Sequence, residues 1–281
     1  MRTKNAMQLK AFIKNKAKEL SISPQIMLQN YYMECFLDRL SKTEYADNFI
    51  IKGGFLISAL IGLNNRATMD IDTTIKKLSL NESEISKVIS YICDVPAEDD
   101  FTFIFDHVEP IREDDEYQGL RVFLFIDYES TRGTLSMDIT AGDSIYPSVK
   151  QIKCKRYFDK TPIPILSYPV ETILAEKLET IISRGLLNTR PRDFYDVYIL
   201  SKTVSFDSKI LAKALAATSE HRETRELVEN EAAPRIAAIE SSDDLKALWK
   251  KYQKKFPYAK GIVFEDTVSA ARKLLESCLG V

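Results

Sequence analysis

Two aspartates stand one residue apart in a segment that otherwise has the composition of a buried β-strand, Asp70 and Asp72 in MDIDTTI. Side chains two residues apart in a strand project from the same face, so both carboxylates share a face while Ile71 points the other way. Two anions at this spacing repel one another and lose hydration unless a cation lies between them. A hard divalent cation such as Mg²⁺, which prefers oxygen ligands, would meet that need. The alternative, an exposed strand end with both side chains bonded to loop N–H groups, stays open on the spacing alone.

A pair of glycines, Gly53 and Gly54, lies upstream at the junction of an expected strand, NFIIKGG, and an expected helix, FLISALIGL. Glycine lets the backbone approach an anion closely, and a helix N-terminus offers free N–H groups and a positive dipole end. A Gly-Gly pair alone more often marks a tight turn. Placed shortly before two strand carboxylates, it indicates a phosphate site and a metal site in one cleft.

A third carboxylate, Asp138, lies inside a later expected strand, TLSMDITAGD. On a neighbouring strand it could stand beside Asp70 and Asp72. Three carboxylates can hold two Mg²⁺ ions, one on a triphosphate and one on the attacking hydroxyl. Asp143 could contribute instead, but it follows a glycine in a turn and is expected to be structural.

A second group of candidates lies in the segment AEKLETIISRGLLNTRPRDFYDVYIL. Lys177 is on an otherwise apolar amphipathic helix, where it is either a surface lysine whose stem covers apolar neighbours or a cation against nucleotide phosphates. Asp193 and Asp196 are three residues apart and share one helix face, although Asp193 could simply balance the helix dipole. Two arginines, Arg190 and Arg192, fit salt bridges and phosphate binding equally well.

Hydrophobic periodicity and turn signals place the first group among alternating helices and strands. Helices are expected over residues 5–40, broken at SISP before a helix from 24 to 40, and then at 55–63 and 81–92. Strands are expected at 48–54, 69–75, 101–111, 119–129 and 134–143. The acidic segment 112–119 predicts a turn that makes an antiparallel hairpin of the strands beside it.

The pattern then changes to helices almost to the end of the chain, at 169–184, 191–201 and 207–217 and more weakly to 278. Prolines at 162, 164 and 169 mark the change. We therefore expect an α+β protein in two domains. Residues 1–165 hold the N-terminal helices and an α/β core with a mixed sheet, and residues 166–281 form an all-helical C-terminal domain.

The composition is that of an ordinary globular protein, with 281 residues, 45% hydrophobic and 28% charged. The formal net charge of −2 neither requires nor excludes a nucleic-acid partner. No signal peptide and no membrane span are expected, because the N-terminus is amphipathic and lysine-rich and no run approaches about 18 apolar residues. Four widely spaced cysteines predict reduced thiols in a cytoplasmic protein. Two histidines leave little material for a histidine metal site or a Ser-His-Asp triad.

Three segments together resemble the AbiEii/AbiGii toxin family, part of the DNA polymerase β-like nucleotidyltransferase superfamily. KGGFLISALIGLNNRATMDIDTTI resembles the first motif, a Gly-Gly/Ser pair, a helix and then R-x-T/S-x-D-x-D. SMDITAGD resembles the later carboxylate strand, and ETILAEKLETIISR with RPRDFYDVYIL resembles a helical motif with a lysine and a downstream aspartate. The likeness covers roughly residues 45–202. Gly54 stands where the wider superfamily often has serine, so a side-chain hydroxyl contact to phosphate is absent.

The resemblance implies a polymerase-β-like nucleotidyltransferase core and a helical domain that completes the active-site cleft. It implies that the metal ligands are Asp70, Asp72 and Asp138. The residues expected to bind the nucleotide or support its loop are Gly53, Gly54, Arg66, Thr68 and Lys177. The acid of the helical motif is either Asp193 or Asp196.

The resemblance also implies a function. It predicts a Mg²⁺-dependent enzyme that transfers a nucleotide from GTP or another NTP to RNA, such as the tRNA 3′ end, with release of pyrophosphate. It further implies a bacterial type IV toxin–antitoxin system, with an AbiEi-like winged-helix antitoxin encoded nearby and a part in abortive infection and phage defence.

Two other functions fit the residues. An NTP-binding regulator would keep the glycines and paired aspartates but would not need Asp138, and an interaction protein would use the aspartates structurally. The basic stretches Lys150–Lys160 and Arg184–Arg192 could steer an RNA acceptor or could be solvated faces, and Lys246–Lys255 is similarly basic.

Overall fold

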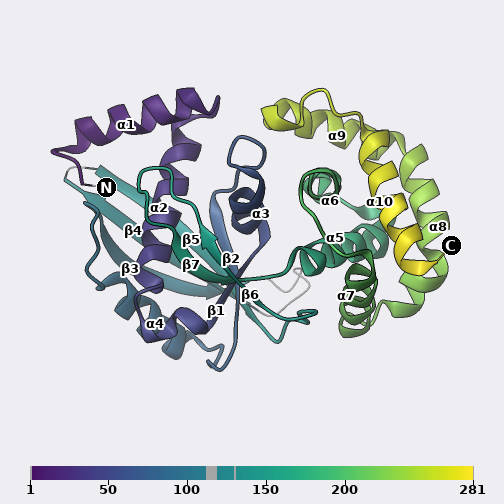
Figure 1. Ribbon diagram of the computed structural model, residues 1–281, viewed down its shortest axis with the longest axis horizontal. Coiled ribbons are helices and arrows are strands. Elements are labelled where there is room, and N and C mark those ends of the chain that lie inside the picture. The colour runs from purple at the N-terminus through teal and green to yellow at the C-terminus, as the bar shows by residue number, and fades with distance from the viewer. Residues whose placement is uncertain (1, 112–118, 130, 281) are drawn as a thin grey trace. The chain divides into compact units, whose positions relative to one another are not determined.

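The computed structural model describes residues 2–111, 119–129 and 131–280 (Figure 1). Contacts between Cα atoms divide the chain into two compact units. The first comprises Met1–Asp143 and Lys150–Ser167, and the second comprises Ser144–Val149 and Tyr168–Val281. The turn expected at 112–119 lies, apart from Gly119, outside the described residues.

The first unit combines a sheet with helices. Its helices are α1 (Ala6–Glu19), α2 (Pro24–Leu40), α3 (Gly53–Ile61) and α4 (Glu82–Cys93). Its strands are β1 (Phe49–Lys52), β2 (Asp70–Ile75), β3 (Thr102–Pro110), β4 (Gly119–Tyr128), β5 (Thr131–Ala141), β6 (Lys150–Cys154) and β7 (Ile163–Ser167). The strands and helices expected up to residue 143 are therefore present.

The sheet is mixed, as the sequence predicts. Its described strands follow the order β3-β4-β5-β2-β1-β7-β6. β2 runs parallel to β5 and antiparallel to β1, while β1 runs parallel to β7. The pairs β3–β4, β4–β5 and β6–β7 are antiparallel, so the expected hairpin is confirmed. The strand that carries the paired aspartates is thus interior, with β5 on one side and β1 on the other.

The second helix begins where the serine and proline signals predict. The Ser23 Oγ accepts a hydrogen bond from the Ile26 N–H at 3.2 Å, and Pro24 occupies the first helical turn. A proline is tolerated there because the N–H that it lacks has no acceptor within the helix. The Gln29 side chain, one turn further along α2, donates to the carbonyl oxygen of Met69 at 2.8 Å and so anchors the entry to β2.

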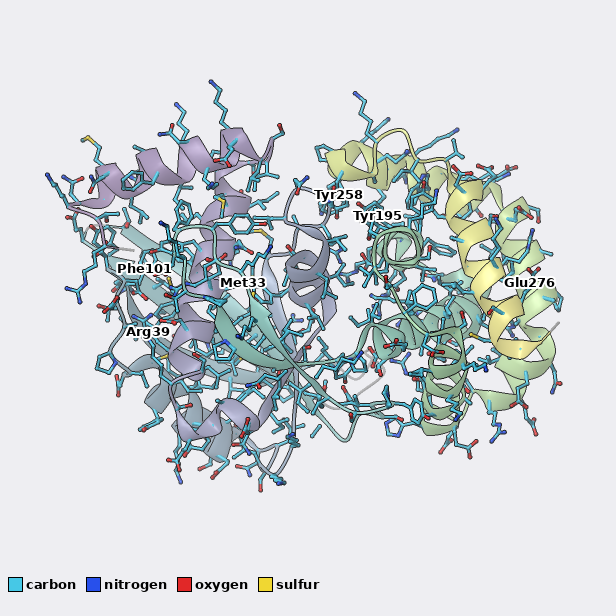
Figure 2. All side chains as sticks on the ribbon, viewed as in Figure 1. Met33, Arg39, Phe101, Tyr195, Tyr258 and Glu276 are labelled. Carbon is cyan, nitrogen blue, oxygen red and sulfur yellow. The ribbon has the colours of Figure 1, made fainter. Side chains whose placement is uncertain are left out.

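A buried ion pair lies at the C-terminal end of α2. Two nitrogens of the Arg39 guanidinium donate to the two Asp99 carboxylate oxygens at 2.5 and 2.9 Å, and one also donates to the Phe101 carbonyl at 2.9 Å. Figure 2 shows Arg39 and Phe101 in this region of the first unit. The pair ties α2 to the segment that enters β3.

Two strands were not expected from the sequence. The basic stretch after residue 150 begins with β6, and the proline-rich segment before the C-terminal helices contains β7. Proline normally argues against an interior strand because it lacks an N–H. Here the pairs between β7 and β1 are formed by Leu166 and Ser167, so Pro164 interrupts none of them.

The second unit is helical. Its helices are α5 (Val170–Arg184), α6 (Pro191–Thr203), α7 (Ser208–His221), α8 (Arg225–Ser241), α9 (Asp243–Lys255) and α10 (Phe264–Leu279). Aromatic side chains contribute to its core, with ring centroids 4.8 Å apart for Tyr195 and Tyr258 (Figure 2) and 6.1 Å apart for Trp249 and Phe264. An α+β fold with C-terminal helices, as the sequence predicts, is confirmed.

Two further expectations concern cysteines and membranes. Every cysteine in the chain is free, and three of the four are buried. Over the ranges that the structure describes, no helix has both the length and the apolar character of a membrane span.

Candidate functional site

Charged side chains form a row across four neighbouring strands. In the pairing register, Asp72 on β2 lies opposite Asp138 on β5. Beyond them, Lys52 on β1 lies opposite Asp72, and Arg121 on β4 lies opposite Asp138. Paired residues of adjacent strands project from the same face of a sheet. The row therefore reads cation, carboxylate, carboxylate, cation.

Asp70 adds a third carboxylate to this face, because it precedes Asp72 by two residues on β2. Its Oδ1 accepts a hydrogen bond from the Thr68 hydroxyl at 2.5 Å. The Oδ2 of Asp72 accepts one from the Gly54 N–H at 3.1 Å. The structure thus brings the three predicted metal ligands to one face of two parallel strands.

Burial, together with the neighbouring carboxylates, raises the pKa of Asp72 above its ordinary value. Burial is the largest cause, the negative charge of Asp70 is the next, and Asp138 adds to it. The N–H of Gly54 and the positive charge of Lys52 act in the opposite direction without reversing the shift. The part of the shift that comes from Asp70 and Asp138 reflects repulsion between like charges, which a bound cation would relieve.

The glycine pair is shaped around these side chains. Gly53 has a φ of +63°, and a Cβ built on it would lie 1.9 Å from Asp72 Oδ2. A Cβ on Gly54 would lie 2.8 Å from the Thr68 hydroxyl oxygen and 2.9 Å from its Cβ. A serine at position 54, which the wider superfamily often has, would collide with Thr68. The Thr68 hydroxyl occupies the space that such a side chain would need.

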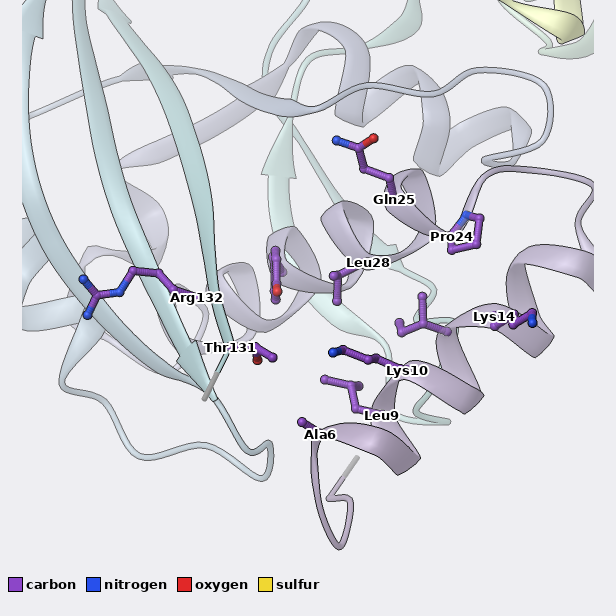
Figure 3. A pocket seen from close by; sticks show the side chains of 11 residues that line it. Ala6, Leu9, Lys10, Lys14, Pro24, Gln25, Leu28, Thr131 and Arg132 are labelled. Atoms are coloured by element: carbon purple, nitrogen blue, oxygen red, sulfur yellow. The ribbon is translucent and has the colours of Figure 1, made fainter. Parts of the chain in front are cut away.

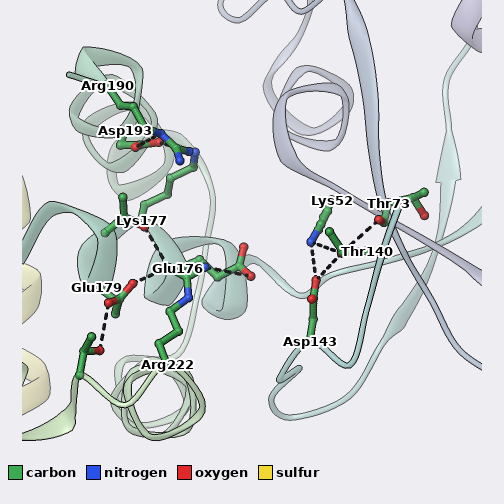
Figure 4. Close-up of polar contacts among 12 residues, drawn as sticks. Lys52, Thr73, Thr140, Asp143, Glu176, Lys177, Glu179, Arg190, Asp193 and Arg222 are labelled. Carbon is green, nitrogen blue, oxygen red and sulfur yellow. Dashed lines mark hydrogen bonds and ion pairs between the residues drawn. The ribbon is translucent and has the colours of Figure 1, made fainter. Parts of the chain in front are cut away.

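Asp143 is held in a buried network, as the structural role expected for it requires. Its Oδ2 accepts from the Lys52 ammonium and from the Thr140 hydroxyl, the latter at 3.1 Å (Figure 4). Lys52 also donates to Thr140 Oγ1 at 2.7 Å. The lysine therefore connects the end of β1 to the end of β5, directly before the glycine turn.

Asp138 is engaged by an arginine. The Arg121 Nε donates to Asp138 Oδ1 at 2.6 Å, and a terminal guanidinium nitrogen donates to Oδ2 at 2.7 Å. This is the bidentate geometry in which guanidinium and carboxylate match best. Both oxygens of the third carboxylate are thus occupied by one side chain.

Sequence reasoning missed Lys52 and Arg121. Lys52 directly precedes the glycine pair, and Arg121 is a lone base in the apolar strand GLRVFLFIDYE. An arginine within the apolar run GLRVFLFI is a signal in itself, because a charged side chain on a largely buried strand is usually paired. Finding that partner requires the strand register, which the sequence does not state.

Arg66 and Thr68 lie in the loop that leads into β2. The Arg66 residue is 5% exposed, and its guanidinium donates to the carbonyl oxygen of Ala67. This contact supports the loop backbone. Thr68 reaches Asp70 as described above, so both residues help to fix the start of the aspartate strand.

The remaining predicted residues form a cluster of their own in the second unit. The Lys177 ammonium lies 2.5 Å from Asp193 Oδ1 and 3.5 Å from Asp196 Oδ2 (Figure 4). Arg190 Nε lies 2.8 Å from Asp193 Oδ2. Both aspartate side chains are fully buried, whereas Arg192 is exposed. Lys177 is thus the shared counterion of two buried acids, and no surface lysine.

Burial opposes ionisation of Asp193, but the charges of Lys177 and Arg190 outweigh it and hold the pKa of Asp193 below its ordinary value. This carboxylate therefore stays ionised at neutral pH. A charged cluster of this kind binds anions only where a cation is shared between the acids and the ligand.

The cavity between α1 and α2, of about 440 Å³, lies apart from the predicted residues (Figure 3). Apolar side chains form most of its wall, among them Leu9, Ile13, Leu28 and Tyr32. Among the described residues that line it, none belongs to the predicted site. The predicted site residues are therefore located by the strand register, and they do not line this cavity.

The carboxylates fit a hard divalent cation by their chemistry, since all three offer oxygen ligands on one face. As they are arranged in the described part of the chain, no group of three acidic, histidine or cysteine side chains is gathered closely enough to hold a metal ion. Each predicted ligand is instead bonded within the protein, Asp70 to Thr68, Asp72 to Gly54 and Asp138 to Arg121.

Comparison with known families decides the identity. The family model described as "Nucleotidyl transferase AbiEii toxin, Type IV TA system" matches residues 35–272. The chain belongs to this AbiEii family. It is accordingly a nucleotidyltransferase, as the sequence motifs predict, and its family is that of the toxins of type IV toxin–antitoxin systems. An NTP substrate and an antitoxin partner follow from that membership.

Solved structures share the fold of this AbiEii chain. JHP933 from Helicobacter pylori is 18% identical to this chain with a TM-score of 0.52. The match covers 92% of this chain and 93% of the JHP933 chain. A candidate nucleotidyltransferase from H. pylori is 16% identical to this chain with a TM-score of 0.50. The match covers 92% of this chain and 96% of the H. pylori chain. No curated protein matches the chain.

Proposed function

We propose that this AbiEii chain transfers a nucleotide from an NTP to an RNA acceptor, such as the 3′ end of a tRNA, in a Mg²⁺-dependent reaction. One observation carries the proposal: Asp72 and Asp138 are register partners on adjacent parallel strands, with Asp70 on the same face. The glycine turn at the start of α3 donates an N–H directly to Asp72. A carboxylate face beside a helix N-terminus suits a nucleotide triphosphate with its cation.

In the proposed reaction the acceptor hydroxyl oxygen forms a bond to the α-phosphorus of the NTP. The bond from the α-phosphorus to the bridging oxygen breaks, and pyrophosphate leaves with its electron pair. The hydroxyl proton passes to Asp138, either directly or through a water molecule. Bound Mg²⁺ would neutralise the charge on the phosphates. Asp70 and Asp72 would hold it, and the first N–H groups of α3 would orient the phosphates.

The helical cluster of the second unit is also proposed to have a role with the nucleotide. We assign Lys177 to the nucleotide phosphates and one of Asp193 and Asp196 to the orientation of that lysine. Lys177 is 13% exposed at its side chain, so its ammonium keeps access to solvent while it balances two buried acids. A lysine held by two carboxylates is pre-oriented and loses little entropy when it meets an anion.

The partner and the setting extend the proposal. We propose an AbiEi-like winged-helix antitoxin, a cytoplasmic site of action and a role in abortive infection and phage defence. RNA is favoured as the acceptor because β6 begins with an exposed lysine, Lys150, and carries a second, Lys153. Lysines on a strand surface attract a phosphate backbone without reading its sequence.

The test compares two aspartates on the same hairpin. Asp138 and Asp127 each accept a bidentate pair from an arginine of the facing strand, but only Asp138 lies beside Asp72. Purified wild type, Asp138→Asn and Asp127→Asn are incubated with each labelled NTP, Mg²⁺ and total bacterial RNA, and the products are separated on a gel. We expect Asp138→Asn to lose about 100-fold or more of the transfer, as for loss of a group that acts in the transition state. Asp127→Asn should transfer normally.

Transfer by Asp138→Asn at the wild-type rate would refute the assignment. If that variant also bound NTP normally by calorimetry, the alternative of an NTP-binding protein without transfer activity would be favoured. Label that appears in protein and not in RNA would replace the RNA acceptor with a protein side chain.

A further inference from the structure

The carboxylate oxygens of Asp138 have two competing uses, one in the proposed reaction and one in the ion pair with Arg121. The proposed reaction needs this carboxylate for a divalent cation or for the acceptor proton. In the structure, Arg121 donates to both of its oxygens at 2.6 and 2.7 Å. A carboxylate oxygen that accepts a short hydrogen bond from a guanidinium cannot also point a lone pair at a cation in the same direction. Each oxygen has a second lone pair, so Arg121 does not block a metal ion completely but competes with it for Asp138.

Arg121 is placed so that it can leave. Its side chain is 39% exposed, whereas that of Asp138 is 19% exposed. The guanidinium can therefore rotate toward solvent and be rehydrated, while the carboxylate stays on the sheet face beside Asp72. A partly exposed ion pair contributes only modestly to stability, because water and salt compete with it. The carboxylate is fixed by the fold, and the arginine is the movable member.

Arg121 also offsets part of the negative charge of the three carboxylates. Three like charges on one face are unfavourable, and the register places Asp72 directly beside Asp138, with Asp70 two residues away on β2. On the β1 side, the Lys52 ammonium is bonded to Thr140 and Asp143. On the β4 side, the Arg121 guanidinium is bonded to Asp138. The arginine thus directly covers one of the predicted metal ligands.

We propose that Arg121 is a displaceable internal counterion, which occupies Asp138 in the absence of a divalent cation and yields it when the cation binds. Arg121 is then a positioning residue that acts through Asp138. It sets the cation concentration at which the site becomes complete, because the intrinsic affinity is reduced by the fraction of molecules in which Asp138 is covered. This inference rests on the proposed metal role of Asp138.

The hairpin supplies a matched control. Arg132 and Asp127 are also register partners on β5 and β4, and their two bonds are both 2.7 Å long. Asp127 is six residues beyond Arg121 on β4, about 20 Å at the rise of a strand. The two pairs have the same chemistry, but one adjoins the carboxylate row and the other lies far along the hairpin.

The experiment measures Mn²⁺ binding to the full chain without nucleotide, by electron paramagnetic resonance of the free ion. Arg121→Gln removes the charge and the bidentate fork, and we expect it to bind Mn²⁺ about fivefold to tenfold more tightly than wild type. Arg121→Lys keeps the charge but loses the fork, and should lie between them. Arg132→Gln should bind as wild type does. In an Asp138→Asn background, Arg121→Gln should change the affinity by less than about twofold.

Unchanged or weaker Mn²⁺ binding by Arg121→Gln would overturn the proposal, since an arginine that only orients Asp138 for the metal would have to weaken binding when removed. A gain of the same size in the Asp138→Asn background would also overturn it, because the effect would then be one of general charge. Thermal melting of each variant confirms folding. The transfer assay with Asp138→Asn decides the proposed function separately, so a failure here and a failure there are distinguishable.

Discussion

Replacement of Gly53 by alanine tests whether the glycine turn and Asp72 form one unit. The residue has a φ of +63°, and an added Cβ would lie 1.9 Å from Asp72 Oδ2 and 2.7 Å from Asp72 Cβ. Neither distance is possible between atoms that are not bonded. Either the Asp72 side chain rotates away or the turn opens. Both outcomes break the hydrogen bond from the Gly54 N–H to Asp72.

The expected loss has two parts. The left-handed backbone costs a residue with a Cβ about 1–2 kcal/mol. Loss of a hydrogen bond to a charged carboxylate costs about 1.5–3 kcal/mol more. A sum of about 2.5–5 kcal/mol lowers the melting temperature by roughly 5–20 °C for a chain of this size class. Displacement of a predicted metal ligand by about 1 Å should reduce nucleotide transfer by about 100-fold.

Gly261→Ala is the control for this experiment. Gly261 also has a positive φ, +84°, but a Cβ added there would meet nothing within 4 Å. This variant should lose only the backbone contribution, melt about 2–8 °C below wild type and transfer nucleotide normally. Transfer is measured with labelled NTP and RNA at a temperature well below both melting points. Gly53→Ala that transfers within about threefold of Gly261→Ala would refute the coupling of the turn to Asp72.

Three further substitutions test charges buried in each unit. Lys177→Gln leaves the buried carboxylate of Asp193 without its closest cation. Removal of one partner of a buried ion pair costs about 3–5 kcal/mol, so we expect a lower urea midpoint together with loss of nucleotide transfer. Because the pKa of Asp193 is lowered in the folded chain, its contribution is present above its unfolded pKa and is lost as pH falls through the folded value, so the variant should differ least from wild type in acid. Burial raises the pKa of Glu34 to about 8, so its contribution to stability is present below the unfolded pKa and is lost as pH rises through about 8. The melting temperature of Glu34→Gln should accordingly rise relative to that of wild type between pH 5 and pH 9. A difference in melting temperature that stays constant over this range would contradict the prediction. Arg39→Ala leaves the buried carboxylate of Asp99 without its counterion, and the urea midpoint of this variant should fall by the equivalent of about 3–5 kcal/mol. The nucleotide affinity of the folded chain should not change.

The sequence predicts most elements because their signals are local. The Ser23-Pro24 pair marks the start of α2, and alternation of apolar residues marks β4 and β5. The paired aspartates are assigned to one face by the period of a strand alone. Asp138 is brought beside them by parallel pairing of β2 with β5, which motif order suggests and only the register fixes.

The elements that were missed depend on non-local pairing. β7 contains Pro164, which locally argues against a strand, and it forms because Leu166 and Ser167 find partners on β1 more than 100 residues upstream. The contact between Arg121 and Asp138 likewise joins residues 17 apart across a hairpin. Lys177 was read as a surface or phosphate-binding side chain. Its burial against two aspartates follows from the packing of α5 on α6, which helical periodicity does not encode.

The charges along the row imply an order in which a cation would be taken up. Asp72 has the raised pKa, and its Oδ2 accepts from a backbone N–H that cannot neutralise it. Asp138 is covered by a full positive charge from Arg121. A divalent cation would therefore meet less competition at Asp72 and Asp70 than at Asp138, where a guanidinium donates to both oxygens. With a cation held at Asp72 and Asp70, the Arg121 guanidinium would be repelled across Asp138, and its ion pair with the third predicted ligand would weaken. Binding of a cation at the β2 aspartates and release of Arg121 from Asp138 on β5 would then be two stages of one electrostatic change.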